Sequence, residues 1–291
     1  MHAVIESLIS EWPVVVTDGS WGTQLQKRGL ARGECPDMWN LSKPEKVREV
    51  ASLYVSAGSR VILTNTFGAN RFVLGKFQAG GKVREINMAG VLLSKEAASG
   101  KALVFASIGP SGVMLVSGDV TEAQLAEAYG EQAEALAGAG ADGLVVETMM
   151  DINEAVIAVR AAKATGLPVV ASMVYDSGKA KDRTMMGNTP EQCSEALAAS
   201  GADVIGANCG QGIEGFIPIC GRLKAATGLP LWMKPNAGLP EMVNGEVVYR
   251  TGAGDFARHV PALVDNGARF IGGCCGTGAD FIQGIIRALE G

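Results

Sequence analysis

Eight short runs of apolar residues recur along the chain, and most of them are continuous rather than alternating in polarity. A continuous apolar run of this length is typical of a parallel strand that is covered on both faces. The eight predicted strands are Pro13–Thr17, Arg60–Asn65, Ala102–Ile108, Gly143–Glu147, Pro168–Val174, Asp203–Asn208, Pro230–Lys234 and Arg269–Gly273.

Stretches with the apolar spacing of helices lie between the predicted strands. They are Glu45–Ala57, Lys82–Ser99, Glu122–Ala139, Ile152–Ala164, Glu191–Ala199 and Asp255–Asn266. A Ser or Thr followed three residues later by Glu or Gln predicts a capped helix start. This pattern occurs at Ser42–Glu45, Thr121–Gln124 and Thr189–Gln192. Glycines just before strands predict left-handed residues that end helices. They are Gly58, Gly100, Gly140, Gly166, Gly201, Gly228 and Gly267.

A short motif at the ends of three predicted helices reveals an internal repeat. Its glycines, Gly140, Gly201 and Gly267, are 61 and 66 residues apart. Each period holds two strand–helix units, as in successive quarters of an eightfold barrel. We therefore expect an α/β fold over residues 1–291, a single-domain TIM (β/α)8 barrel. A doubly wound parallel sheet is the alternative.

Two loops that follow predicted strands are longer than the others, Asp18–Lys43 and Asn236–Gly254. In the second loop, Asn244-Gly245 lies between two apolar pairs and predicts a small hairpin. In a barrel both loops emerge at the carboxyl ends of the strands, where active sites are built.

Composition narrows the class of protein. Of 291 residues, 47% are hydrophobic, which excludes a disordered chain. The net charge of −5, without a basic cluster, argues against a nucleic-acid or anionic-membrane surface. No apolar run approaches the roughly 20 residues that span a bilayer, and residues 1–11 lack the pattern of a signal peptide. We expect a cytoplasmic protein whose six cysteines are not a disulfide framework.

Polar residues at the ends of the predicted strands are the candidates for chemistry, because in a barrel they point into the site. Three of these nine residues are cysteines. Three thiolates with one open position suit a catalytic zinc ion, whereas buried packing is the alternative for free cysteines. The glycines within Gly272–Thr277 leave room for two successive cysteines to face one ion. The nine residues are Asp18, Asn65, Thr66, Glu147, Asn208, Cys209, Asn236, Cys274 and Cys275.

Other residues permit weaker interpretations. Gly276-Thr277-Gly278 precedes a helix and is a candidate phosphate loop, although no Lys or Arg lies nearby. His2 is terminal and His259 lies on a predicted outer helix, so a histidine-dependent triad is disfavoured. The remaining cysteines are expected to be structural, namely Cys35, Cys193 and Cys220.

Asp18 and Glu147 are the best candidate carboxylates. A carboxylate at a strand end holds a substrate ammonium through a charge-assisted hydrogen bond, whereas bracing of a loop is the alternative. The loop Gly19–Thr23 offers backbone N–H groups to a substrate carboxylate, or is an ordinary tight turn.

Several stretches together resemble the homocysteine S-methyltransferase family, in particular the homocysteine-binding domain of cobalamin-dependent methionine synthase. The resemblance covers roughly residues 14–288. Its most specific part is Cys209 combined with Cys274-Cys275. The matching stretches are Asp18–Thr23, Leu63–Arg71, Ser107–Pro110, Glu147–Asp151, Ala207–Cys209, Lys234–Gly238 and Gly272–Thr277.

This resemblance implies an eightfold barrel in which Cys209, Cys274 and Cys275 hold Zn²⁺ and the sulfur of homocysteine takes the fourth position. By the same resemblance, the substrate amino group lies near two carboxylates, and its carboxylate meets N–H groups of the first loop. The implied substrate-binding residues are Asp18, Gly19, Ser20, Asn65, Glu147, Asn208 and Asn236, of which Asn236 lies beside the metal.

The activity that the resemblance implies is methyl transfer to homocysteine, giving methionine. A sulfonium such as S-methylmethionine is the favoured donor, with a betaine-type donor or a separate corrinoid protein as alternatives. Two other classes stay open: a module that binds homocysteine and presents it to a partner, and a phosphate-binding barrel enzyme that needs no zinc.

Overall fold

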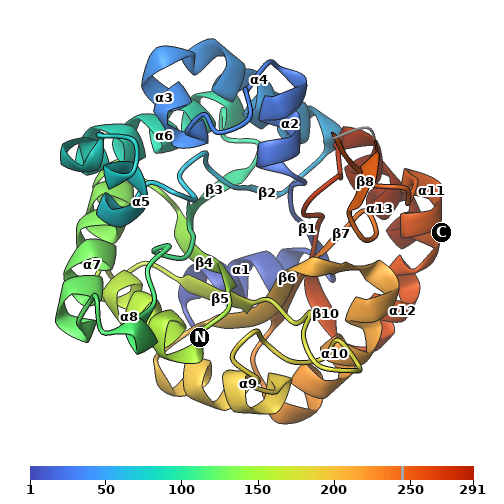
Figure 1. The fold of residues 1–291 in the computed structure, drawn as a ribbon. Helices are drawn as coiled ribbons and strands as arrows, with labels where there is room; N and C mark the ends of the chain where they lie inside the picture. Colours follow the sequence, from blue (N-terminus) through green and yellow to red (C-terminus); the bar gives the residue numbers. More distant parts are fainter. Residues whose placement is uncertain (244–245) are drawn as a thin grey trace.

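The computed structural model describes residues 1–243 and 246–291. Eight parallel strands form one sheet in the order β1-β10-β7-β6-β5-β4-β3-β2 (Figure 1). A bridge between Thr17 and Val61 and a 2.7 Å hydrogen bond from Arg60 N–H to Val16 O join the first strand to the second. The sheet therefore closes into the expected barrel and is not doubly wound. Its strands are β1 (Val15–Val16), β2 (Val61–Ile62), β3 (Leu103–Ile108), β4 (Gly143–Met149), β5 (Val169–Met173), β6 (Val204–Gly212), β7 (Leu231–Asn236) and β10 (Ala268–Ile271).

Helices surround the barrel and follow the strands in sequence (Figure 1). The stretch predicted as one helix at 255–266 is divided at His259, and Pro261 lies in the first turn of the second helix. The α-helices are α1 (Ala3–Glu11), α2 (Trp21–Lys27), α3 (Trp39–Ser42), α4 (Pro44–Ala57), α5 (Arg71–Gly75), α6 (Val83–Ala98), α7 (Glu122–Gly138), α8 (Ile152–Lys163), α9 (Pro190–Ala199), α10 (Ile213–Ala226), α11 (Ala253–Arg258), α12 (Val260–Asp265) and α13 (Ala279–Glu290). The 3₁₀ turns are η1 (Pro36–Met38), η2 (Gly80–Lys82) and η3 (Leu115–Ser117).

Two of the three predicted capping boxes are present. The side chains of Thr121 and Thr189 accept hydrogen bonds from the third residue of their helices, and each box is complete. The box predicted at Ser42 is wrong, because the ring of Pro44 starts α4 instead and the Ser42 hydroxyl donates to Met38 O at 3.1 Å.

The predicted helix-ending glycines are left-handed with one exception. Gly228 does not adopt a positive φ, because α10 ends through Thr227 in extended conformation. The others have φ between 75° and 101°, namely Gly58, Gly100, Gly140, Gly166, Gly201 and Gly267.

At the amino-terminal ends of the strands, the barrel lumen is filled by apolar side chains and closed by α1. Ile5 and Leu8 of this helix pack against an aromatic layer formed by Phe105, Trp232 and Phe270. The Trp232 ring lies 6.5 Å from that of Phe105 and 5.5 Å from that of Phe270. Figure 1 shows α1 crossing behind the strands. We call this end the apolar layer.

The same strands carry polar residues two positions further toward their carboxyl ends. Because side chains of a strand alternate between faces, residues two apart both point into the lumen. Phe105 is followed in this way by Ser107, and Trp232 by Lys234. Other strands also carry buried polar residues toward their carboxyl ends, and we call the whole set the polar layer. It consists of Asp18, Ser107, Glu147, Ser172, Asn208 and Lys234, all buried.

The two long loops hold extra elements above the carboxyl ends of the strands. The first contains α2, η1 and α3. The second contains the antiparallel strands β8 (Glu241–Val243) and β9 (Glu246–Val248), which confirms the arms of the predicted hairpin. Its turn, Asn244-Gly245, lies outside the described residues. Within the described ranges, no helix has both the length and the apolar character needed to span a bilayer.

Candidate metal centre and substrate pocket

Three cysteines that are far apart in sequence meet at the mouth of the barrel. Cys209 belongs to the end of β6, and Cys274 and Cys275 follow β10. Their Sγ atoms all lie within 4.8 Å of one another, and those of Cys209 and Cys275 are 3.9 Å apart. The structure thus brings together the cysteines that the sequence singles out. Their role as zinc ligands stays a prediction.

The backbone around the cysteines is specialised. Cys209 has a φ of +64°, a conformation that is uncommon for a residue with a side chain. At this point the pairing of β6 with β7 shifts register, so that the chain loops out between Asn208 and Gly212. The other two cysteines are tied to β7, because Cys274 N–H donates to Pro235 O at 2.8 Å and Cys275 N–H to Asn236 Oδ1 at 3.0 Å.

The donor set fits a zinc ion. Tetrahedral zinc with Zn–S bonds of about 2.3 Å places its sulfurs about 3.8 Å apart, close to the separation seen here. Hydrogen bonds shared among the sulfurs, first from Cys274, lower the pKa of the Cys209 thiol. The hydrogen bond with Cys209 is the largest cause that raises the pKa values of Cys274 and Cys275. The cluster therefore favours one thiolate without a metal, and a metal that bound all three sulfurs would displace the other two protons into solvent.

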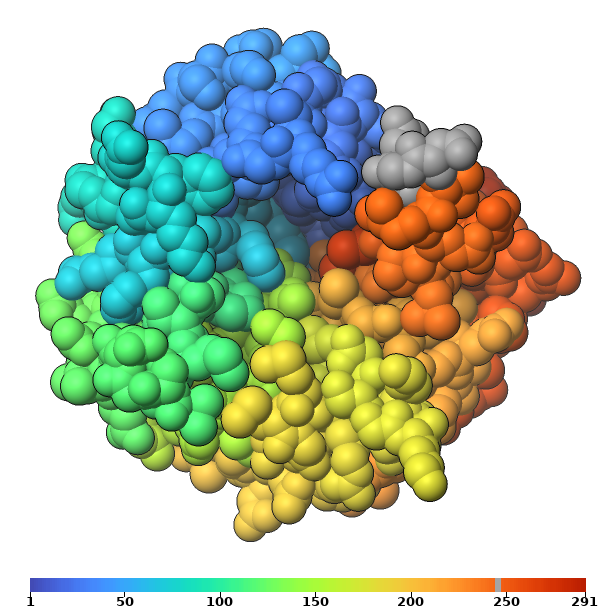
Figure 2. Space-filling model, viewed as in Figure 1, coloured from blue at the N-terminus to red at the C-terminus, as the bar shows by residue number. Residues whose placement is uncertain are grey.

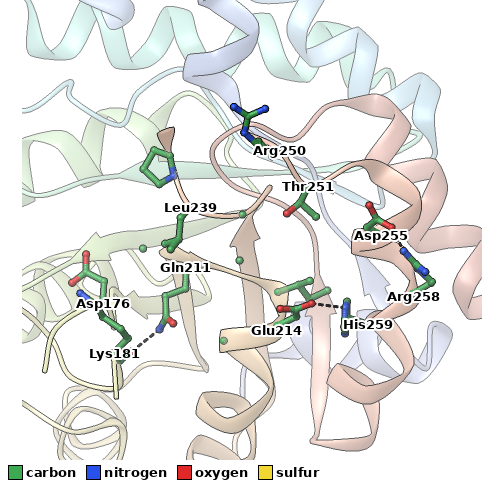
Figure 3. Close-up of a pocket in the computed structure, with 16 residues that line it drawn as sticks. Asp176, Lys181, Gln211, Glu214, Leu239, Arg250, Thr251, Asp255, Arg258 and His259 are labelled. Carbon is green, nitrogen blue, oxygen red and sulfur yellow. Dashed lines mark hydrogen bonds and ion pairs between the residues drawn. The ribbon is translucent and has the colours of Figure 1, made fainter. Parts of the chain in front are cut away.

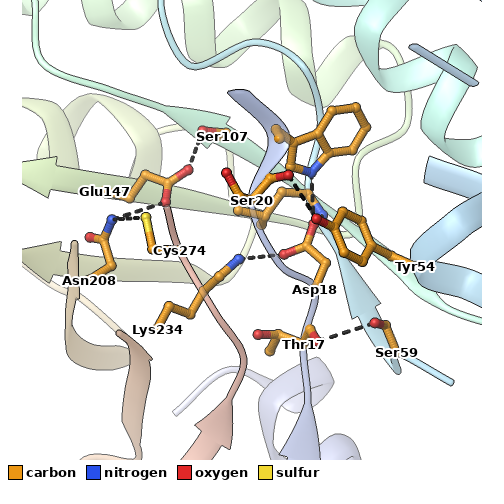
Figure 4. Close-up of polar contacts among 12 residues, drawn as sticks. Thr17, Asp18, Ser20, Tyr54, Ser59, Ser107, Glu147, Asn208, Lys234 and Cys274 are labelled. Carbon is orange, nitrogen blue, oxygen red and sulfur yellow. Dashed lines mark hydrogen bonds and ion pairs between the residues drawn. The ribbon is translucent and has the colours of Figure 1, made fainter. Parts of the chain in front are cut away.

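Glu147 ends the polar layer next to the cysteines (Figure 4). Its Oε1 accepts a 2.5 Å hydrogen bond from Ser107 Oγ, and its Oε2 lies 3.4 Å from Asn208 Nδ2. Burial raises the pKa of this carboxyl, and the nearby ammonium of Lys234 opposes that rise. One oxygen of Glu147 therefore has spare acceptor capacity for a cation at the mouth.

Asp18 is engaged more fully. It is completely buried, and its Oδ1 forms an ion pair with Lys234. Its Oδ2 accepts from Trp21 Nε1 at 2.8 Å and from Leu63 N–H at 2.7 Å. The two predicted carboxylates thus differ, since both oxygens of Asp18 bind close donors, whereas Oε2 of Glu147 has only the 3.4 Å contact with Asn208 among the described residues. A contact of Asp18 with a substrate ammonium stays a prediction.

Lys234 is the residue whose role the sequence did not reveal. Its side chain is 2% exposed and points from β7 toward Asp18 (Figure 4). Burial alone lowers the pKa of a lysine, but Asp18 and Glu147 outweigh this effect and raise it, so the ammonium is charged. A lysine inside an otherwise apolar strand was the available signal, although its partners lie far away in sequence.

The first loop packs against the cysteine loop. Ser20 N–H donates to Thr277 Oγ1 at 3.2 Å, and the Ser20 hydroxyl caps α2. A Cβ on Gly19 would lie 2.9 Å from atoms of both Thr277 and Tyr54, so only glycine fits without displacement. Capture of a substrate carboxylate by the Gly19 and Ser20 N–H groups stays a prediction, and the Ser20 group would first have to leave Thr277.

The three predicted asparagines lie in different surroundings. Asn236 and Asn208 contact the cysteine loop, through Cys275 N–H and Cys274 Sγ respectively. Asn65 instead donates from its amide to Pro36 O at 2.8 Å and to a neighbouring asparagine, Asn40, at 3.0 Å. The structure therefore gives Asn65 a bracing role in the first loop. A contact with substrate through its Oδ1 stays a prediction.

The alternative sites are less well supported. Gly276 N–H donates to Thr23 Oγ1 and Thr277 N–H to Cys274 O, both at 3.2 Å, so the candidate phosphate loop has two of its donors engaged. His259 Nε2 pairs with Glu214, and His2 caps α1, which leaves neither histidine at the mouth.

Exposed apolar side chains gather around the mouth. Of thirteen large apolar side chains that are exposed in the described part of the chain, eleven lie in loops after strands. Figure 2 shows that this face is hollowed at its centre. We call these eleven residues the apolar rim: Phe67, Phe77, Met114, Val116, Met150, Met185, Met186, Leu239, Met242, Val243 and Val247.

A separate cavity of about 820 Å³ lies beside the Cys209 loop, between the first turn of α10 and α11 (Figure 3). Its charged side chains are largely paired with one another, as in Glu214–His259 and Asp255–Arg258. Neither Glu147 nor a cysteine is among its described lining residues. This cavity is therefore distinct from the mouth of the barrel.

Comparison with known proteins agrees with this geometry. A family model described as Homocysteine S-methyltransferase matches residues 15–289. Methionine synthases of Mycobacterium leprae (strain TN) and Mycobacterium tuberculosis are 27% and 28% identical, each over 95% of this chain. The chain spans only 24% of the length of these relatives.

The fold is shared with a solved structure. The homocysteine methyltransferase MmuM from Escherichia coli, in its metallated form, superposes with a TM-score of 0.81 at 23% identity, covering 97% of this chain and 98% of that one. From the extent of the family match, this chain belongs to the homocysteine S-methyltransferase family.

Proposed function

We propose that this chain transfers a methyl group to homocysteine in a zinc-dependent reaction, with a small sulfonium such as S-methylmethionine as donor and methionine as product. The observation that carries the proposal is the cluster of Cys209, Cys274 and Cys275. The side-chain amide of Asn208 contacts both this cluster and the carboxylate of Glu147. Three sulfurs supply three ligands of a tetrahedral ion and leave the fourth position for a substrate thiol.

The chemistry needs a thiolate, because a free alkyl thiol with a pKa near 8.5 is mostly protonated at neutral pH. Zinc, when bound, would supply the Lewis acidity that favours the deprotonated form. In the transfer, a bond forms between the sulfur of homocysteine and the methyl carbon. The carbon–sulfur bond of the donor breaks and its electron pair stays with the departing thioether. The thiol proton goes to solvent.

The residues of the polar layer hold the other end of homocysteine. Glu147 accepts hydrogen bonds from the ammonium group, since its Oε2 is the less engaged carboxylate oxygen. Asp18 lies behind it and fixes Lys234, whose charge opposes the rise in the pKa of Glu147 that burial causes. Gly19 and Ser20 receive the substrate carboxylate, and Asn236 lies beside the metal ligands.

Replacement of one cysteine ligand tests the proposal. Cys274→Ser is expected to weaken zinc binding by at least about 100-fold, because loss of an outer partner alone weakens metal affinity by up to about that factor. Transfer of a methyl group to homocysteine falls with the bound zinc. The measurements are metal content and methionine formation.

Cys193→Ala, in the buried face of α9, is the matched control and keeps one zinc per chain. A Cys274→Ser protein that is free of zinc and as active as the parent protein would overturn the mechanism.

A protein-bound corrinoid is a second candidate donor, and two observations favour it. The curated relatives are methionine synthases about four times as long as this chain. In addition, the apolar rim surrounds the entrance to the site, which is typical of a surface that contacts another macromolecule. A betaine-type donor is the remaining alternative.

The donors are separated by one assay. The zinc-loaded protein is incubated with homocysteine and, in turn, S-methylmethionine, betaine or a methylcobalamin-loaded protein, and methionine is measured. Turnover with the sulfonium supports the first proposal. Turnover with the corrinoid protein alone supports the second, and tight binding of homocysteine without any turnover indicates a presenting module.

A further inference from the structure

The side chain of Asn208 joins the two ends of the proposed substrate site. It is fully buried at the end of β6, and its Oδ1 accepts from Thr148 N–H at 2.8 Å and from Ser172 Oγ at 2.7 Å. Its Nδ2 donates to Thr148 Oγ1 at 2.7 Å and lies 3.4 Å from Glu147 Oε2 and 3.8 Å from Cys274 Sγ. Figure 4 shows the contacts from its amide nitrogen to the carboxylate and to the sulfur.

The orientation of this amide is fixed by its surroundings. A backbone N–H only donates, so the atom facing Thr148 N–H must be the carbonyl oxygen. The amide nitrogen is then the atom that faces the Thr148 hydroxyl, Glu147 and Cys274. Asn208 therefore contacts the carboxylate and a sulfur through one rigid group.

Thr148, the main partner of Asn208, has an unfavourable backbone. Its φ is +60°, and a β-branched residue rarely adopts a left-handed conformation. Such strain persists only where the surroundings impose it, and it gathers at functional sites. Asn208 binds both the N–H and the hydroxyl of Thr148, which holds the residue next to Glu147 in place.

We propose that Asn208 and Thr148 are positioning residues that set the separation between Glu147 and the cysteine cluster, and thereby select homocysteine over cysteine. The inference rests on the proposed function, in which Glu147 takes the ammonium and the metal takes the sulfur. The two amino acids carry the same end groups and differ by one methylene between them. A site with both anchors fixed therefore discriminates by length.

Thr148→Ala tests this inference, because it removes the hydroxyl that Asn208 holds and leaves the carboxylate and the cysteines intact. Calorimetry with the zinc-loaded protein measures its affinity for homocysteine and for cysteine, without a methyl donor. The expected result is a loss of homocysteine affinity of about tenfold, with cysteine affinity unchanged, because one methylene is worth about 10- to 200-fold in discrimination. Bound zinc stays at one per chain.

Two further variants make the test specific. Thr148→Ser keeps the hydroxyl and is expected to retain the homocysteine preference within about twofold. Thr184→Ala is the control, since the Thr184 hydroxyl is likewise bound by an asparagine, Asn188, in another loop, although Thr184 is buried and Thr148 only half-buried. It is expected to leave the preference unchanged.

The outcomes separate this inference from the proposed function. Equal loss of affinity for both amino acids in Thr148→Ala, or no loss for either, would overturn the role of Thr148 and Asn208 as a length gauge while leaving the methyltransferase proposal standing. Failure of the parent protein to bind zinc or homocysteine would overturn the proposed function, and this inference with it.

Discussion

The two ends of the barrel lumen are built by the same strands and differ in every other respect. At the amino-terminal ends of the strands, α1 packs against the rings of Phe105, Trp232 and Phe270, and this cluster contains no charged group. Further toward the carboxyl ends of the barrel strands, the polar layer buries two carboxylates and an ammonium. The apolar layer gains free energy from every contact, whereas each charge of the polar layer must be compensated by a partner. Stability and chemistry are thus separated along one axis.

The largest expected effect lies in the apolar layer. Trp232→Ala leaves a large cavity beneath Gly206, whose lack of a side chain admits the backbone of Trp232. We expect a loss of ~4 to 5 kcal/mol in the free energy of unfolding, measured by urea denaturation. The folded fraction is expected to bind zinc as before.

Trp232→Phe is the companion variant. The indole N–H has no hydrogen-bond partner among the described residues, so its removal leaves no polar group unpaired. A loss as large as that of the alanine variant would contradict the view that this end contributes packing alone.

The next effect lies in the polar layer. Lys234→Met leaves Asp18 buried without its cation, and we expect the free energy of unfolding to fall by ~3 to 4 kcal/mol. Asp18→Asn combined with Lys234→Met restores part of this loss, because residue 18 is then neutral and no longer needs the lysine as its counter-charge. A double-mutant cycle by urea denaturation measures the coupling. Additive effects of the two substitutions would show that the ion pair contributes nothing.

The smallest expected effect on stability concerns Asp37, a buried carboxylate that belongs to neither layer. Asp37, in η1, accepts from Gly68 N–H at 2.9 Å and contacts the Cys35 thiol, but forms no salt bridge within residues 1–243 and 246–291. Burial raises the pKa of Asp37 to about 6 from a usual 3.8.

The sign of the pH dependence follows from this shift. Between these pKa values the folded chain holds a proton that the unfolded chain has lost, so stability falls as pH rises. Relative to Asp37→Asn, the parent protein is expected to lose ~2 kcal/mol of unfolding free energy between pH 4.5 and pH 7. Denaturation of both proteins across this range is the measurement. Parallel curves would show that Asp37 has an ordinary pKa.

Local patterns predicted the fold and the positions of the candidate site. Apolar runs located the strands, and polar residues at their ends named Glu147 and the three cysteines, because strand ends of a barrel share one face. The cap at Ser42 failed because Pro44 offered a competing helix start. Local sequence patterns thus predict a helix or strand well where no competing signal lies nearby.

Contacts that form only when the barrel closes could not be predicted from local patterns. The partner of Lys234 is Asp18, at the opposite end of the chain, and only pairing of β1 with β10 brings them together. The left-handed backbone of Thr148 has no signal in its residue type, since a threonine usually signals a strand. Such features arise from the assembled structure rather than from local preference.

The pairing of Val15 with Phe270 also determines the order in which this molecule is completed. During synthesis on the ribosome, α1 and β1 emerge before any of their lumen partners, and the ring closes only after β10 has been made. Until then the sheet has two open edges, and the apolar layer against which Ile5 and Leu8 pack lacks Phe270. An unfinished barrel is accordingly more exposed to aggregation than the closed one.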